Sequence, residues 1–127
     1  MITKQKRPKF LNLLRIHLPV TGVNSFAHRV SGFFLFLAIP LFIIAFNMSL
    51  RDPASFNRLL AILQTPWIKF VLTVLTWAIA HHLLAGIRFL LTELDIGTSL
   101  EASKRAAWVI NIFGVVVLAV AAYWIWI

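Results

Sequence analysis

The stretch VSGFFLFLAIPLFIIAFNMSL, from Val30 to Leu50, decides the fold class of this chain because it contains no Asp, Glu, Lys or Arg. A helix rises 1.5 Å per residue, so about 20 apolar residues cross the hydrocarbon layer of a bilayer. Two further stretches are similarly free of charge: Phe70–Ile87, which we expect to extend to about Pro66 and Leu91, and Ala106–Ile127. The sequence therefore predicts an all-α integral membrane protein with three transmembrane helices.

The composition favours the same class. Of the 127 residues, 61% are apolar and 13% are charged, whereas soluble domains are nearer half apolar and a quarter charged. The chain has no cysteine, which excludes disulfides, thiolate metal sites, iron–sulfur ligation and a cysteine nucleophile. The net charge of +8 comes from residues that flank the apolar runs, so lipid headgroups explain it better than nucleic acid.

We expect a single transmembrane anchor domain over residues 1–127, with an interfacial segment over 1–24 and helices at approximately 25–49, 66–92 and 104–126. Pro40 should kink the first helix, and Arg51-Asp52-Pro53 should form a turn after it.

Basic residues predict the orientation. The positive-inside rule places a lysine- and arginine-rich end in the cytoplasm. Three crossings then put the C-terminus in the periplasm, and we expect the bacterial inner membrane in preference to the mitochondrial one. The basic residues of the N-terminal segment are Lys4, Lys6, Arg7, Lys9 and Arg15, and no acid precedes Asp52.

Polar residues gather at the inner end of the first span. Ser25, Arg29 and Gly32 share a helical face, with His28 beside them. A hydroxyl and a guanidinium one turn apart can donate hydrogen bonds to a carbonyl, and glycine lets a flat ligand or a helix approach. The alternative is a capping serine and an arginine that reaches the headgroups.

The second span carries His82 and Gly86 on one face. A neutral imidazole in a dry interior suits haem iron, and the glycine would clear space for the porphyrin. Arg88 lies near the interface, where it could pair with a haem propionate or extend to the lipid headgroups. His81 points about 100° away from His82, toward a different neighbour, and its role stays open. The alternative for His82 is a hydrogen bond between helices.

Depth argues against two axial ligands from this chain. If the first helix begins near Phe26, His28 and His82 differ in depth by roughly 12 Å. Two axial nitrogens lie about 4 Å apart. A second axial histidine should therefore come from another subunit, with His28 nearer the propionates.

Two motifs in this order, H-R-x-S-G and H-x-x-x-G-I-R, carry a resemblance over nearly the whole chain. The chain resembles the cytochrome b556 subunits of succinate dehydrogenase, which are membrane anchors of respiratory complex II. The matching residues are Arg7-Pro8, Leu18-Pro19-Val20-Thr21, Ser25, His28-Arg29-Val30-Ser31-Gly32, His82, Gly86-Ile87-Arg88 and Lys104-Arg105.

The resemblance implies that His82 is the axial ligand of haem b, shared with a partner anchor subunit, and that Ser25 and Arg29 bind ubiquinone. His28 matches a histidine near the haem propionates. The anchor would hold a flavoprotein and an iron–sulfur subunit, whose electrons from succinate reach the quinone, while this chain performs no succinate chemistry. Phe89 and His81 depart from some relatives, which have histidine and tyrosine there.

Three other functions remain open. An anchor of a fumarate reductase or other quinone-linked oxidoreductase differs only in the direction of electron flow. A small transporter or channel subunit would carry acids near mid-membrane, which these spans lack. The third alternative is a structural assembly factor with buried histidines.

Overall fold

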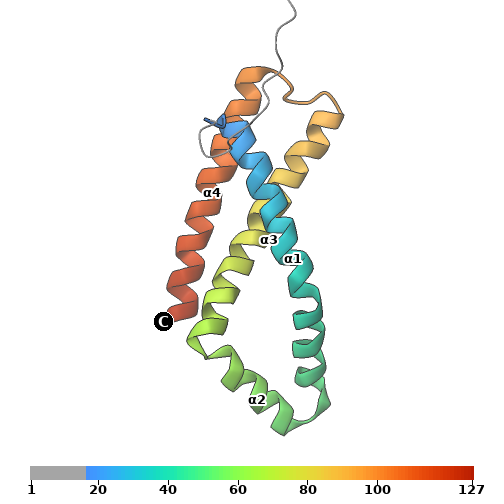
Figure 1. The fold of residues 1–127 in the computed structure, drawn as a ribbon, viewed down its shortest axis with the longest axis vertical. Coiled ribbons are helices and arrows are strands. Elements are labelled where there is room, and N and C mark those ends of the chain that lie inside the picture. The colour runs from blue at the N-terminus through green and yellow to red at the C-terminus, as the bar shows by residue number, and fades with distance from the viewer. Residues whose placement is uncertain (1–16) are drawn as a thin grey trace, which may run out of the picture.

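The computed structural model describes residues 17–127, and the basic residues and Arg7-Pro8 of the N-terminal segment lie outside them. The described chain is entirely helical apart from its connections (Figure 1). Three of its helices are long and apolar enough to cross a membrane, which confirms the predicted fold class. The direction of crossing stays a prediction. The helices are α1 (Val20–Arg51), α2 (Pro53–Leu63), α3 (Pro66–Glu93) and α4 (Leu100–Trp126).

Helices α1 and α3 cross each other, and α4 packs against α3 and also touches α1 (Figure 1). Small residues make these contacts close, since Ala78, Ala85, Ala107 and Gly114 are all buried. Membrane helices pack in this way because lipid is as apolar as leucine, so close backbone approach supplies the attraction. Most large apolar side chains instead face outward, where lipid solvates them.

Helix α1 begins at Val20, earlier than the expected start near residue 25. Pro19 precedes it in an extended conformation, and Val23 N bonds to the Pro19 carbonyl at 3.0 Å. The additional turn contains Asn24, which is fully buried rather than interfacial. The helix then continues through Pro40 as one element.

Helix α3 starts at Pro66, as its missing N–H allows, and α4 starts at Leu100 rather than near residue 104. Ser99 explains this earlier start of α4, because its hydroxyl accepts a hydrogen bond from Ala102 N at 3.3 Å. At the far end, Trp126 Nε1 donates to Thr73 Oγ1 at 3.3 Å and ties α4 to α3.

Helix α2 was not expected from the sequence. Asp52 caps it, accepting hydrogen bonds from the backbone N of Ser55 at 2.8 Å and from its Oγ at 2.7 Å. These bonds hold the pKa of the Asp52 carboxyl below its usual value. The apolar residues Phe56, Leu59, Leu60 and Leu63 recur at helical spacing, which is typical of a helix lying at a membrane surface.

Where α1 and α3 diverge toward α2, the three helices line an apolar groove of about 610 Å³. Leu41, Leu59 and Leu72 contribute to its walls, one from each helix. The residues singled out in the spans, His28, Arg29, His82 and Arg88, lie toward the opposite end of α1 and α3.

Candidate functional site

The structure brings His28 of α1 and His82 of α3 into direct contact. Their imidazole rings stack with centroids 4.1 Å apart and planes inclined by 9°. Both side chains are half-buried, so the pair remains accessible at the α1–α3 surface. The two histidines singled out from the sequence therefore belong to one site.

Hydrogen bonds hold the His82 ring by one nitrogen. Nδ1 lies 3.0 Å from the carbonyl oxygen of His28 and 3.2 Å from Ser31 Oγ. A carbonyl can only accept, so Nδ1 donates to it and carries the proton. The neutral ring then has its lone pair at Nε2, the nitrogen that a metal would bind.

Glycine is required beside the His82 ring. A Cβ placed on Gly32 would lie 2.9 Å from His82 Cε1 and 3.3 Å from Nδ1, too close for an undisturbed ring. At Gly86 the contact is looser, since a Cβ there would meet His28 Nε2 at 3.5 Å. The space beside Gly32 is thus filled by the imidazole of this chain.

The expected depth difference between His28 and His82 is wrong. His28 lies eight residues after the first residue of α1, and His82 eleven residues before the last residue of α3. At 1.5 Å per residue these depths are about 12 Å and about 16 Å, hence nearly equal. The error came from starting the first helix near Phe26 instead of at Val20.

The stacked geometry still argues against one iron held by both rings. The lone pair of an imidazole nitrogen lies in the plane of its ring, so lone pairs of parallel stacked rings run side by side and do not converge. The second axial ligand from another chain stays a prediction, with this geometric reason in place of the depth estimate.

Ser25 and Arg29 lie one turn apart near the start of α1, with Ser25 half-buried and Arg29 exposed. They do not lie on the buried face of α1, which carries Asn24 and Ser31, the fully buried residues of this region. The Ser25 hydroxyl and the Arg29 guanidinium are thus accessible from outside the bundle. A lipid-soluble carbonyl compound could reach them there.

A polar network crosses the end of the bundle where α1 begins. Asn24 Nδ2 donates to Asn111 Oδ1 at 3.2 Å, and Arg88 Nη1 donates to Asn24 Oδ1 at 3.4 Å, so α1, α3 and α4 are linked. Arg88 Nε is buried with no partner among residues 17–127. The guanidinium also lies 5.3 Å from the ring centroid of Phe89, whose ring meets His28 edge-on.

His81 faces α4 rather than the histidine pair. It is 2% exposed, stacks on Trp77 at 5.4 Å, and packs where a Cβ on Gly114 would come within 3.3 Å of Nδ1. Both of its ring nitrogens are unpaired within the described chain.

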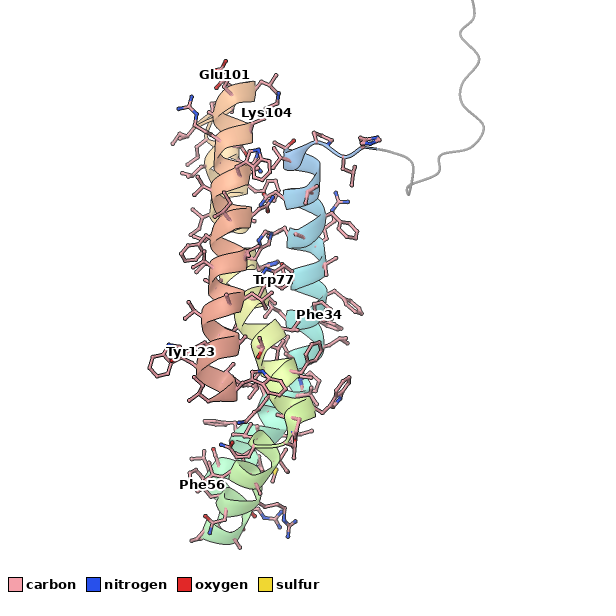
Figure 2. All side chains as sticks on the ribbon, turned by 90° about the vertical axis from the view of Figure 1, so that its left-hand side faces the viewer. Phe34, Phe56, Trp77, Glu101, Lys104 and Tyr123 are labelled. Carbon is pink, nitrogen blue, oxygen red and sulfur yellow. The ribbon has the colours of Figure 1, made fainter. Side chains whose placement is uncertain are left out.

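Figure 2 shows nitrogen-bearing side chains gathered between α1 and α4 above Trp77, toward Lys104, whereas carbon dominates below.

Sequence reasoning missed three residues of this region. Ser31 was matched only as part of a motif, and Asn24 and Asn111 received no role. Asn24 and Ser31 are spaced seven residues apart, two helical turns, which is the signal that one buried face of α1 carries both. The partner of Asn24 lies 87 residues away and has no local signal.

Comparisons with known proteins cover almost the whole chain. The family described as succinate dehydrogenase/fumarate reductase transmembrane subunit matches residues 3–122. A succinate dehydrogenase cytochrome b556 subunit from Coxiella burnetii is 33% identical over 122 residues, covering 95% of this chain and 98% of that protein. Proteins of the same name from Paracoccus denitrificans and Rickettsia felis are each 29% identical, covering 94% and 81% of this chain and 91% and 80% of their own lengths.

Proposed function

The chain belongs to the succinate dehydrogenase/fumarate reductase transmembrane subunit family, and from this premise we propose that it is a haem b-binding membrane anchor of succinate:quinone oxidoreductase. Family membership confirms the resemblance to cytochrome b556 subunits. The names of the three relatives favour succinate dehydrogenase over fumarate reductase as the complex.

One observation carries the haem assignment. His82 is held at Nδ1 by the His28 carbonyl, which leaves the Nε2 lone pair for iron. Protein ligands of metals are commonly oriented in this way by a bond from the other ring nitrogen. His82 would therefore hold the haem iron from this chain, and a partner anchor subunit would supply a second ligand.

Arg88 fits a neighbouring anion. Its guanidinium bonds to a neutral amide, and the one ion pair within residues 17–127 is the exposed contact between Arg51 and Asp52 at 4.0 Å. A half-buried cation is stabilised by an opposite charge, and the carboxylate of a haem propionate would supply one. His28 and Arg88 thus belong to the propionate side of the site.

Haem b, when bound, supplies a one-electron reservoir whose potential depends on its axial ligands. Ubiquinone is the substrate that we assign to Ser25 and Arg29. The serine hydroxyl and the arginine guanidinium would donate hydrogen bonds to a quinone oxygen and stabilise the negative charge that develops there. The exposure of Arg29 supports this, because the quinone arrives from the lipid.

The soluble chemistry belongs to other subunits. This chain would hold a flavoprotein and an iron–sulfur subunit at the cytoplasmic face of the bacterial inner membrane and take no part in succinate oxidation. The four acids, Asp52, Glu93, Asp95 and Glu101, all lie at or beyond helix ends, which disfavours a transporter with a mid-membrane carboxylate.

The test is purification of the complex in mild detergent with a tag on this chain. We expect a flavoprotein, an iron–sulfur protein and a reduced-minus-oxidised spectrum of b type. In His82→Ala, haem incorporation should be abolished or strongly reduced. A normal haem spectrum in that variant contradicts the ligand assignment, and a colourless wild-type complex contradicts the proposal as a whole.

Orientation has its own test. Single cysteines at positions 5 and 127 should react with an impermeant thiol reagent from the cytoplasmic and periplasmic sides respectively. The cysteine-free sequence supplies the unreactive control. Labelling from the opposite sides contradicts the expected topology.

A further inference from the structure

Ser31 connects two other groups of the histidine site. Its side chain is fully buried on α1. Oγ donates to the His28 carbonyl oxygen at 2.8 Å and lies 3.2 Å from His82 Nδ1, which itself bonds to the same carbonyl at 3.0 Å. The hydroxyl, the carbonyl and the imidazole nitrogen therefore form a closed triangle.

We propose that Ser31 is a positioning residue that fixes the tautomer and orientation of His82. This inference rests on the proposed role of His82 as haem ligand. The hydroxyl proton is committed to the His28 carbonyl, so the side of Oγ that faces Nδ1 presents a lone pair. Both atoms that face Nδ1 are acceptors, which requires the proton on Nδ1 and the lone pair on Nε2.

A local backbone bond alone does not explain Ser31. Serine within a helix commonly bonds to a carbonyl of its own preceding turn. Ser49, near the other end of α1, makes that bond to the Phe46 carbonyl at 2.7 Å and has no hydrogen bond to a histidine within residues 17–127. Ser31 differs from Ser49 in its second contact, to His82, and in its complete burial.

The surroundings restrict the ring from further directions. His28 covers one face of the His82 ring at 4.1 Å, and Gly32 abuts Cε1. Rotation about the ring axis is opposed by the two contacts at Nδ1. Loss of the hydroxyl therefore releases the ring and weakens its orientation toward a ligand at Nε2 without removing the ligand itself.

The experiment uses the purified complex with this chain tagged and its partner subunits present. Ser31→Ala should release haem to excess apomyoglobin about tenfold faster than wild type, in keeping with loss of an outer-shell contact to a metal-ligating histidine. The electron paramagnetic resonance signal of the oxidised haem should broaden or shift, because the ring takes several orientations. Ser49→Ala is the matched control and should change neither measurement.

Ser31→Cys tests loss of the hydrogen bonds without emptying the space, since the sulfur is larger than the hydroxyl oxygen and is a weak donor. We expect it to behave like Ser31→Ala, and it also serves if the alanine variant does not assemble. Wild-type haem release and an unchanged resonance signal in either assembled variant overturn the inference. His82→Ala distinguishes the two levels. If this variant retains haem, the assignment of His82 as the ligand fails. If His82→Ala loses haem while the Ser31 variants behave like wild type, only the role of Ser31 fails.

Discussion

Replacement of Gly32 by alanine tests the packing of the histidine site most directly. The added Cβ would lie 2.9 Å from His82 Cε1, whereas carbon atoms in contact prefer about 3.5–4.0 Å. The ring must withdraw by about 0.6 Å or more. A displacement of that size along the 3.0 Å bond from Nδ1 to the His28 carbonyl brings it to about 3.6 Å, beyond hydrogen-bond geometry.

Stability is the weaker readout of this variant. Overpacking costs about 1–3 kcal/mol, and alanine in place of glycine within a helix offsets about 1 kcal/mol of that. The net change in the free energy of unfolding is therefore small. Haem affinity should respond more strongly, by about tenfold or more, because the orientation of the ligand is lost.

The assay is the haem content of the purified complex, from the reduced-minus-oxidised spectrum normalised to the amount of flavin. Gly22→Ala is the control on the same helix, where the nearest atom to an added Cβ, Pro19 Cδ, lies at an ordinary 3.4 Å. Equal haem content in Gly32→Ala, Gly22→Ala and wild type refutes the packing argument.

Three further outcomes are expected. Ser25→Ala and Arg29→Leu should each slow quinone reduction by about tenfold or more while succinate oxidation with an artificial acceptor persists, and equal loss of both activities contradicts a quinone role. Asn24→Leu should destabilise the bundle by about 1–3 kcal/mol, measured as a lower melting temperature of the complex, and an unchanged temperature contradicts the importance of the network. The pKa of Asp52 is lowered by bonds from Ser55, so its cap stabilises α2 at neutral pH and is lost as pH falls through that lowered pKa. Exchange-corrected protection of α2 amides should therefore fall with acidification in wild type and vary little in Asp52→Ala, and parallel pH profiles for the two proteins contradict the capping role.

The three spans could be predicted because each contains a long run without charge, and lipid imposes that pattern directly. The start of α1 could not, because Asn24 is polar and was therefore assigned to an interfacial segment over residues 1–24. Asn24 enters the bundle because Asn111 and Arg88 satisfy its side chain. Such pairing depends on tertiary structure that no local pattern encodes.

Helix α2 was missed although its signals were present. Asp52-Pro53 is a capping residue followed by a favoured first helical residue, and apolar side chains recur from Phe56 to Leu63 at helical spacing. The sequence analysis predicted only a turn at Arg51-Asp52-Pro53 after the first span. A helix of 11 residues is too short to cross a bilayer, so the length criterion for transmembrane spans does not detect it.

The candidate site was predictable in its residue types and not in its contacts. His28 and His82 were selected because imidazoles are costly within a membrane. Their mutual stacking could not be anticipated, since a small error in the start of one helix changed the estimated depth by about two turns. Ser31 acquires its contact with His82 only once α1 and α3 are packed.

The link between Asn24 and Asn111 has a consequence for biosynthesis. A ribosome releases the first of these residues into the membrane long before it has made the second, 87 positions later. During that interval the amide and the arginine of the network must be satisfied by water, headgroups or the insertion machinery. The final closure of the bundle therefore follows, and cannot precede, the delivery of the last helix.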